Sequence, residues 1–484
     1  MLFNSVEFVF FLPIVFLIYW AIGYAKISET LRLRVQNAFV VIASYVFYGW
    51  WDWRFLLLIA FTSFCSWGSG ILIDKSREFS VKRSIFWLWL NIAINIGILA
   101  VFKYYDFFTS EFCRLFGLSS DGLLIKIILP VGISFYTFQA LSYSIDVYRG
   151  NIKPTKDIIA FFAYIAFFPQ LVAGPIERAT NLLPQFLRNR KFSYEQGADG
   201  MRQILWGLFK KIVIADNCAL YVNQVWETYD TQSGSTLLLA AVLFAFQIYG
   251  DFSGYSDIAI GTAKLFGIKL MRNFNNPYFS RDIAEFWRRW HISLTTWFRD
   301  YVYIPLGGSR VGKWKIVRNT FVIFLVSGIW HGANWTFLAW GAYHALLFLP
   351  LILLGANRKY TNDEWKVESE KWKEILQMFV TFALVVIGWI IFRAETITQA
   401  WEYLCGMCQS SLWQLPSIPD TKRFLPVPLM LAVLVFFEWI NRSRAHGLAI
   451  ENYPRWARRT IYACILTFLF LFTNQPQTFI YFQF

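Results

Sequence analysis

The chain has 484 residues, of which 57% are hydrophobic and only 16% are charged, and its mean hydropathy is +0.43. An ordinary soluble domain carries about 25% charged residues, so this composition excludes a soluble globular protein, a disordered chain, a coiled coil and a disulfide scaffold. The net charge of +14 lies in short basic runs between apolar segments, which indicates contact with anionic lipid headgroups rather than with nucleic acid.

Apolar segments of about 20 residues, the length that crosses a bilayer, recur along the whole chain. The strongest lie near residues 6–24, 36–50, 55–73, 84–102, 123–148, 157–174, 236–250, 316–330, 333–354, 375–392, 425–440 and 461–475. Segments 202–222 and 251–268 are weaker candidates, because charged residues interrupt them. The sequence therefore predicts an all-α polytopic integral membrane protein with about 11–13 transmembrane helices.

The alternation of apolar segments and basic loops becomes less clear between residues 175 and 315. Lys210 and Lys211 interrupt one segment, and a densely charged stretch begins at Arg281. Charged or irregular backbone survives at membrane depth only where it lines a cavity or is buried in protein. We therefore expect re-entrant or tilted helices around a cavity in this region, together with the functional site.

The charged stretch 280–305 has the periodicity of a single amphipathic helix. Ser280 is predicted to cap its N-terminus, and Pro305 is predicted to end it. An aromatic stripe on this helix is formed by Trp287, Trp290, Leu294, Trp297 and Tyr301. A polar stripe on another side is formed by Arg288, Thr295 and Arg299, with His291 at its border.

Two interpretations of this helix stay open. It is either an interfacial amphipathic helix anchored by tryptophans, or a helix whose cations and His291 line a funnel for an anionic ligand such as the phosphates of coenzyme A. In both cases Glu285 is placed to pair with Arg288 or Arg289, three and four residues further on.

The chain has four histidines, His291, His331, His344 and His446. His331 ends a strongly apolar segment, and a histidine within a membrane segment usually faces a cavity or a partner. His344 is interpreted as a hydrogen-bonded core residue, and His446 as a solvated loop residue. A metal site would need two or three histidines with carboxylates at ligand spacing, and the sequence has no such pattern. A single histidine that takes a proton from a hydroxyl is the simpler prediction.

Polar side chains also interrupt the apolar stretch 250–261, which contains Asp251, Ser253, Ser256 and Asp257. Each carboxylate is interpreted either as the structural partner of a nearby arginine or as part of the functional site. The sequence has neither a GxSxG nucleophile elbow nor a Walker loop, which argues against a hydrolase and an ATP-driven pump.

Several stretches together resemble the membrane-bound O-acyltransferase family, and specifically its bacterial subgroup of alginate O-acetyltransferases. They are residues 130–139, 167–176, 247–257, 285–300, 303–308 and 328–332. These stretches follow in order over nearly the whole chain. The D-alanyl transferase of teichoic acid shares much of the pattern, so the resemblance indicates the subgroup better than it indicates the acyl group.

The resemblance implies one membrane domain over residues 1–484 with the fold of that family, and a catalytic core over residues 123–345 whose helices line a central tunnel. It implies that His331 is the catalytic histidine, a general base for an acceptor hydroxyl, and that His291 is the second signature histidine. Candidates for lining the tunnel or binding the donor are Arg288, Arg289, Trp290, Thr295, Arg299, Asp257 and Ser253. The expected donor is cytoplasmic acetyl-CoA, used as a substrate, and no bound cofactor or metal is expected.

Residues 476–484 resemble the C-terminal tyrosine motif of this subgroup. The hypothesis is that Tyr481 receives the acetyl group and passes it to a periplasmic partner of SGNH type, which acylates the polymer. The alternative interpretation is that Tyr481 is an aromatic anchor at the membrane interface.

The predicted protein is thus a multi-pass enzyme of the bacterial inner membrane that serves O-acetylation of an extracytoplasmic polysaccharide: an alginate-like exopolysaccharide, cellulose or peptidoglycan. Two rivals stay open, a D-alanyl transferase for teichoic acid and a carrier of a lipid-linked precursor without its own chemistry. The stretch 355–374 alternates in charge sign, and is predicted to be a solvated helix with no assigned role.

Overall fold

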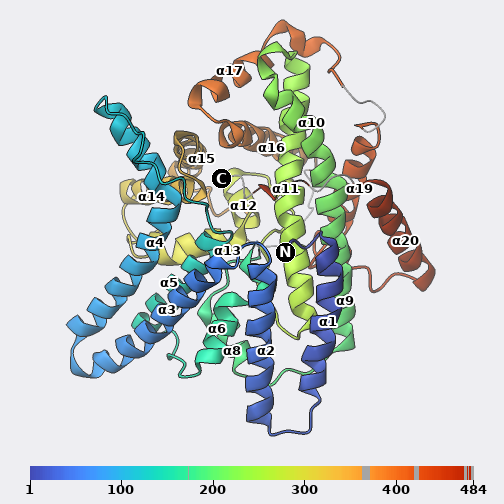
Figure 1. Ribbon diagram of the computed structural model, residues 1–484. Helices are drawn as coiled ribbons and strands as arrows, with labels where there is room; N and C mark the ends of the chain where they lie inside the picture. Colours follow the sequence, from blue (N-terminus) through green and yellow to red (C-terminus); the bar gives the residue numbers. More distant parts are fainter. Residues whose placement is uncertain (173, 362–370, 419–423, 474–476, 478, 481–484) are drawn as a thin grey trace. The chain divides into compact units, whose positions relative to one another are not determined.

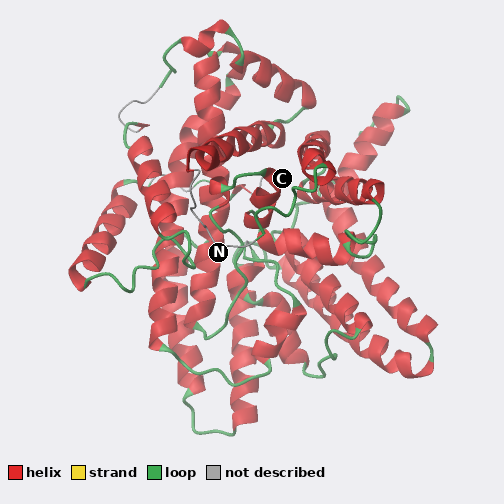
Figure 2. Cartoon of the chain, turned by 180° about the vertical axis from the view of Figure 1, so that it is seen from behind, coloured by secondary structure: helices red, strands yellow, loops and turns green. Residues whose placement is uncertain are grey.

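The computed structural model describes residues 1–484 except 173, 362–370, 419–423, 474–476, 478 and 481–484. Over the described residues the chain forms helices and loops without a β-strand (Figure 2), which confirms the predicted all-α fold. The chain divides into two compact units, one of Met1–Met201 with Ala259–Met271, the other of Arg202–Ile258 with Arg272–Phe484. Helices α9, Tyr194–Leu208, and α11, Gly234–Leu265, contribute residues to both units. Both helices are labelled in Figure 1.

The first unit is built mainly from long apolar helices near the N-terminus. Its further helices are α1 Val6–Gly23, α2 Glu29–Gly49, α3 Arg54–Phe79, α4 Val81–Leu115, α5 Ile133–Arg149, α6 Ile158–Ala166, α7 Phe168–Leu171 and α8 Ala179–Phe186. Helix α3 packs against α4 and α5, and α2 packs against α1 and α6. Helix α1 exposes Val9, Phe10 and Leu17, as expected of side chains that face lipid.

The predicted span 123–148 is wrong in its first part, because the helix begins only at Ile133. Pro130 has no backbone N–H to donate, and Gly132 has a left-handed φ of 74°. A Cβ on Gly132 would lie 2.4 Å from the carbonyl oxygen of Leu171. The chain therefore passes this point as a close turn rather than as a helix. The predicted span 157–174 is likewise divided, into α6 and α7.

The second unit holds the shorter helices of the middle region and the C-terminal helices. They are η1 Phe209–Ala215, α10 Asp216–Glu227, η2 Tyr229–Thr231, η3 Pro277–Phe279, α12 Ile283–Arg289, α13 Ile292–Phe298, η4 Arg299–Tyr303, α14 Lys313–His331, α15 Trp335–Leu353, α16 Lys371–Arg393, α17 Ile397–Met407, η5 Ser410–Trp413, α19 Val427–Ile440 and α20 Arg455–Leu471. Of these, η1 and η4 are π-helical turns.

Six of the described helices are long and apolar enough to cross a membrane. They are α1, α3, α4, α11, α15 and the part of α16 from Trp372 to Arg393. The chain is therefore polytopic, and the larger number of spans expected from hydropathy stays a prediction. Helices α12 and α13, with 7 residues each, are too short to cross a bilayer.

Helix α11 is continuous where the sequence predicted two separate segments. The charges that interrupted the apolar pattern are neutralised by η1: Lys210 Nζ lies 2.5 Å from Asp257, and Lys211 Nζ lies 2.7 Å from Asp251. The structural partners of these carboxylates are thus lysines and not the arginines that we predicted. Because each buried charge has an opposite charge beside it, the helix can continue through this region.

Glycines allow the backbone of α11 to approach the α9–η1 segment closely. A Cβ on Gly254 would lie 2.8 Å from the carbonyl oxygen of Gly207, and a Cβ on Gly250 would lie 2.9 Å from that of Lys210. Small residues at such contacts are typical of helix packing in membranes. This close approach explains why the stretch 247–257 has glycines at positions 250 and 254.

Helices α14 and α15 pack as a tight pair, and two glycines face the partner backbone. A Cβ on Gly328 would lie 2.3 Å from the carbonyl oxygen of Phe337, and a Cβ on Gly341 would lie 2.4 Å from that of Phe324. No side chain fits at either point without moving a helix. This contact fixes the end of α14, where His331 lies.

We expect Gly328→Ala to push α14 away from α15 and to lower the free energy of unfolding by about 1–3 kcal/mol, the usual cost of overpacking. The thermal unfolding midpoint in detergent measures this effect. Gly312→Ala is the control, because among the described residues, its two chain neighbours apart, no atom lies within 4 Å of a Cβ at Gly312. Equal midpoints for the two variants would contradict the prediction.

Candidate active site

The helix predicted across residues 280–305 is broken at its centre, so that prediction is wrong. Helix α12 ends at Arg289 and α13 begins at Ile292, while Trp290 between them is extended. The backbone N–H of Ile292 donates to the carbonyl oxygen of Asn273 at 2.8 Å, and that of Asn275 donates to the carbonyl oxygen of Arg289 at 2.9 Å. These bonds to the segment 273–275 replace helical ones, so the break depends on a distant part of the chain.

His291 lies in this break with a left-handed backbone, at φ 44°. A non-glycine residue in this conformation costs about 1–2 kcal/mol, and such strain concentrates at functional sites. The side chain is 1% exposed, and its Nδ1 lies 3.0 Å from Asn273 Oδ1. Complete burial lowers the pKa of His291 to about 3, so its imidazole is neutral at physiological pH.

The neighbours of Asn273 determine the tautomer of His291. The backbone N–H of Ser293 can only donate, and it points to the same Asn273 atom at 3.4 Å, while Asn273 Nδ2 donates to Ser256 Oγ at 3.1 Å. The shared atom is therefore an oxygen, and His291 Nδ1 carries the proton that it accepts. The lone pair of His291 consequently lies on Nε2.

His331 lies at the C-terminal end of α14, 6% exposed and surrounded by aromatic rings. Its ring centroid is 4.9 Å from that of Trp330, 5.1 Å from that of Trp340 and 5.2 Å from that of Phe392. The ring of Trp330 is in turn 6.0 Å from that of His291. The structure thus brings His291 and His331 into contact with the same tryptophan.

His344 belongs to the same aromatic cluster but is held as a packing residue. Its Nδ1 accepts a hydrogen bond from Trp287 Nε1 at 3.4 Å, and its ring lies 5.1 Å from that of Trp340. This agrees with the interpretation of His344 as a hydrogen-bonded core residue. His446, which we interpreted as a solvated loop residue, is only 4% exposed, so that interpretation is wrong.

The C-terminal segment reaches the surroundings of His291. Phe479 is fully buried, and its ring lies 4.3 Å from that of Tyr255 and 6.1 Å from that of Phe252. The Phe252 ring contacts His291 edge-on at 4.6 Å. The ring of Phe252 therefore contacts both His291 and Phe479 of the C-terminal segment. Tyr481 itself lies outside the described residues.

Known proteins are similar to this sequence over most of its length. The model of the membrane-bound O-acyltransferase family, MBOAT, matches residues 153–391. The protein named probable alginate O-acetylase AlgI of Pseudomonas aeruginosa is 40% identical over 86% of this chain and 77% of its own length. The peptidoglycan O-acetyltransferase of Helicobacter pylori is 33% identical over 100% of this chain and 98% of its own. The teichoic acid D-alanyltransferase of Bacillus subtilis is 31% identical over 55% of this chain and 69% of its own.

The chain belongs to the membrane-bound O-acyltransferase family. The match confirms the resemblance seen in the sequence, and it makes the protein an O-acyltransferase and a multi-pass membrane protein. The rings around His291 and His331 are therefore the candidate active site of this O-acyltransferase.

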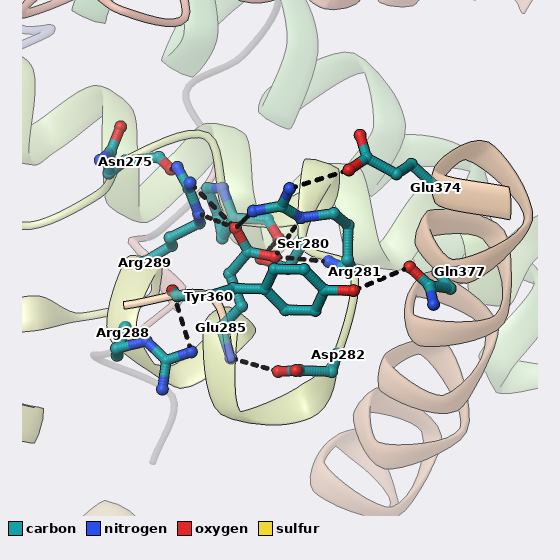
Figure 3. A network of polar contacts seen from close by, with 11 residues as sticks. Asn275, Ser280, Arg281, Asp282, Glu285, Arg288, Arg289, Tyr360, Glu374 and Gln377 are labelled. Atoms are coloured by element: carbon teal, nitrogen blue, oxygen red, sulfur yellow. Dashed lines mark hydrogen bonds and ion pairs between the residues drawn. The ribbon is translucent and has the colours of Figure 1, made fainter. Parts of the chain in front are cut away.

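A buried charge network holds α12, which precedes the break, in place in the O-acyltransferase (Figure 3). Glu285 lies between Arg281 and Arg289, with a nitrogen of each 3.0 Å from its Oε1. Arg281 also pairs with Glu374 of α16 at 3.2 Å, and its guanidinium lies 3.9 Å from the centre of the Tyr360 ring. Glu285 thus pairs with Arg289, one of the two partners that we predicted.

Arg288, the other predicted partner, faces a different part of the chain. Its guanidinium donates to the carbonyl oxygen of Asn357 at 3.0 Å. It also donates to the carbonyl oxygen of Tyr360 at 3.2 Å (Figure 3). The charged stretch 355–374 therefore begins by contacting α12, although we had assigned it no role, and its residues 362–370 lie outside the described part. The N-cap of α12 is Asp282, whose carboxylate accepts from the Glu285 backbone N–H at 2.7 Å, and not Ser280.

The predicted polar stripe of the charged stretch is not formed, because it requires one continuous helix and the chain leaves helical geometry at Trp290 and His291. Arg299 is exposed and pairs with its neighbour Asp300 at 2.6 Å, away from Arg288. Thr295 is half-buried, and its hydroxyl donates to the carbonyl oxygen of Trp290 at 3.3 Å. Trp290 is buried against the ring of Trp389 at 4.8 Å.

The two candidates on α11 lie in the second unit, Ser253 buried and Asp257 half-buried. Ser253 is 1% exposed, and Asp257 accepts a hydrogen bond from Gln203 at 2.8 Å besides its ion pair with Lys210. A role for these residues in lining a tunnel stays a prediction.

The sequence reasoning missed two residues of the site, Asn273 and Trp330. Trp330 directly precedes His331, so its position was available in the sequence. Asn273 orients a histidine eighteen positions away in the chain, and no local pattern marks it.

Proposed function

We propose that this protein moves acetyl groups from cytoplasmic acetyl-CoA across the bacterial inner membrane for O-acetylation of an envelope polysaccharide. The acceptor polymer is an alginate-like exopolysaccharide, cellulose or peptidoglycan, and a periplasmic SGNH-type partner completes the transfer. Acetyl is favoured over D-alanyl because the acetyltransferase relatives align over 86% and 100% of this chain, against 55% for the D-alanyltransferase.

The observation that carries the proposal is the pair of buried histidines that both contact Trp330, one of which also contacts Phe252 next to Phe479 of the C-terminal segment. In the proposed reaction His331 takes the proton of the acceptor hydroxyl as general base. The hydroxyl oxygen attacks the thioester carbonyl, a C–O ester bond forms and the C–S bond breaks. The proton passes from His331 to the leaving thiolate, which departs as CoA thiol. His291, neutral and with its lone pair on Nε2, accepts a hydrogen bond and so orients the hydroxyl.

The first acceptor in this scheme is the phenol of Tyr481. Phe479 and Ile480, which directly precede it, are both buried near Phe252 and Tyr255. The acetyl ester on Tyr481 is then the form in which the partner takes over the acyl group. This scheme gives the terminal tyrosine a chemical task that an interfacial anchor would not have.

Purified protein incubated with acetyl-labelled CoA tests the proposal by mass spectrometry of the C-terminal peptide. We expect one acetyl group on Tyr481 of the wild type and none in Tyr481→Phe, which keeps the ring and removes the hydroxyl. In cells Tyr481→Phe should lose the acetylation of one of the three polymers. Full polymer acetylation by Tyr481→Phe would refute the relay. Absence of both label and CoA release, with or without the partner, would favour D-alanine transfer or a carrier.

A further inference from the structure

A buried cluster of three charged residues, Lys211, Asp216 and Asp251, makes hydrogen bonds to the backbone of the C-terminal segment. Lys211 Nζ lies 2.8 Å from Asp216 Oδ1 and 2.7 Å from Asp251 Oδ1, and it donates to the carbonyl oxygen of Gln477 at 3.2 Å. Asp251 uses its other oxygen, Oδ2, to accept the backbone N–H of Ile480 at 2.7 Å. The cluster therefore holds two backbone groups of the segment, at residues 477 and 480.

Burying the charges of this cluster away from water costs free energy. Lys211, Asp216 and Asp251 are 1%, 5% and 3% exposed, and Asp251 lies near the middle of the membrane-crossing helix α11. Charged groups at membrane depth are expensive, and they usually mark a functional site. One lysine would neutralise one carboxylate, so a second carboxylate here needs its own explanation.

The hydrogen-bonding geometry supplies that explanation. An ammonium group has three donors, and Lys211 directs them to Asp216, Asp251 and Gln477. Asp216 orients the lysine from one side, while Asp251 connects it to the N–H of Ile480. The two backbone bonds hold the segment, and the buried Phe479 ring against Tyr255 determines which of its residues make them.

The hydrogen bonds of Lys211 and Asp251 to the C-terminal segment lie next to the candidate active site. Phe252 directly follows Asp251, and its ring contacts both Phe479, at 6.1 Å, and His291, at 4.6 Å. Ile480, the residue bonded to Asp251, directly precedes Tyr481.

We propose that Lys211 and Asp251 are positioning residues that fix the register of the C-terminal segment and thereby present Tyr481 to the histidines. The inference rests on the proposed function of Tyr481 as acyl acceptor. The two residues touch no acyl donor and take no part in the chemistry. They determine whether the phenol is within reach of it.

Four variants of the full-length protein test the proposal in two matched pairs. Asp251→Asn removes the charge that binds both Lys211 and Ile480, and its control Asp216→Asn alters the same lysine without a contact to the segment. Ile480→Pro removes only the N–H that Asp251 accepts, and its control Ile480→Val keeps it. Amide hydrogen exchange of the C-terminal peptide measures docking. Labelled acetyl-CoA measures the rate of Tyr481 acetylation and the KM for the donor.

We expect Asp251→Asn and Ile480→Pro to exchange faster and to acetylate Tyr481 about 10²-fold more slowly, a loss typical of a misplaced reactant, with the KM for acetyl-CoA unchanged. Ile480→Val should resemble the wild type in both measurements, and Asp216→Asn, which removes one partner of Lys211 but no bond to the segment, should lie between the wild type and Asp251→Asn. A general loss of folding would raise exchange throughout the protein and would affect Asp216→Asn equally. Unchanged exchange in Asp251→Asn and Ile480→Pro would overturn the docking role, and an unchanged rate of acetylation with faster exchange would overturn the positioning role. A wild type whose segment is protected but never acetylated would refute the proposed function while confirming the docking.

Discussion

Replacing His331 by alanine is expected to reduce acetyl transfer by about 10³-fold, the usual contribution of a general base. The side chain is buried among Trp330, Trp340 and Phe392, so its removal leaves the acceptor hydroxyl without a group to take its proton. The rate of CoA release in the presence of partner and polymer measures the loss. The KM for acetyl-CoA should change little, because the histidine acts on the acceptor.

The control for this variant is His344→Gln. His344 is also fully buried and also lies 5.1 Å from the Trp340 ring, but its Nδ1 is occupied by Trp287 Nε1. A glutamine can still accept that hydrogen bond, so we expect His344→Gln to keep most of the activity. Equal losses in the two variants would mean that packing of the aromatic cluster, and not proton transfer, explains the effect of His331→Ala. A fully active His331→Ala protein would favour the carrier.

Replacing Glu285 by glutamine is expected to lower the free energy of unfolding by about 3–5 kcal/mol, the cost of leaving buried charges without their partner. Glu285 is 1% exposed and receives nitrogens of both Arg281 and Arg289 at 3.0 Å. A neutral amide would leave Arg289 without its carboxylate and Arg281 with only the partly exposed carboxylate of Glu374. Because α12 precedes the break at His291, activity should fall together with stability.

The thermal unfolding midpoint in detergent, with activity measured below it, tests the Glu285 prediction. Glu374→Gln is the matched control, since Glu374 also pairs with Arg281 but has a side chain that is 25% exposed. Water can replace part of that interaction, so the control should lose far less stability. A Glu285→Gln protein as stable as Glu374→Gln would show that the network does not stabilise α12.

The elements that the sequence predicted well are those that local composition determines. The apolar stretches became helices, and the histidines chosen from their scarcity and surroundings, His291 and His331, lie around one tryptophan. The contact between Glu285 and Arg289 also followed from helical spacing, because both lie within α12.

The elements that the sequence did not predict depend on contacts between distant segments. Nothing between residues 283 and 298 is a proline or glycine, so periodicity alone predicts one helix there. The helix breaks because Asn273 and Asn275 supply backbone hydrogen bonds at the point where Trp290 and His291 leave helical geometry. The polar stripe of Arg288 and Arg299 was lost with it.

The same reason explains why α11 was predicted as two segments. Hydropathy counts Asp251 and Asp257 as interruptions, and it cannot see that Lys210 and Lys211 of η1 neutralise them. The two lysines were themselves counted as interruptions of another segment. The ion pairs form only in the folded chain, and they reduce the cost of placing the charges of both segments in an apolar environment.

The pairing of η1 with α11 also bears on the proposed passage of an acyl group through the membrane. Two adjacent lysines of η1 pair with two carboxylates that lie about 9 Å apart along the α11 axis. The two ion pairs oppose both rotation and sliding of η1 relative to α11. Sliding by one helical turn would break both ion pairs at once and separate the contact at Gly207 and Gly254. Carriers that alternate access rock one bundle of helices against another. Two segments held together at two points are expected to stay in place during the proposed reaction. Only the acyl group and the acceptor that carries it would then move.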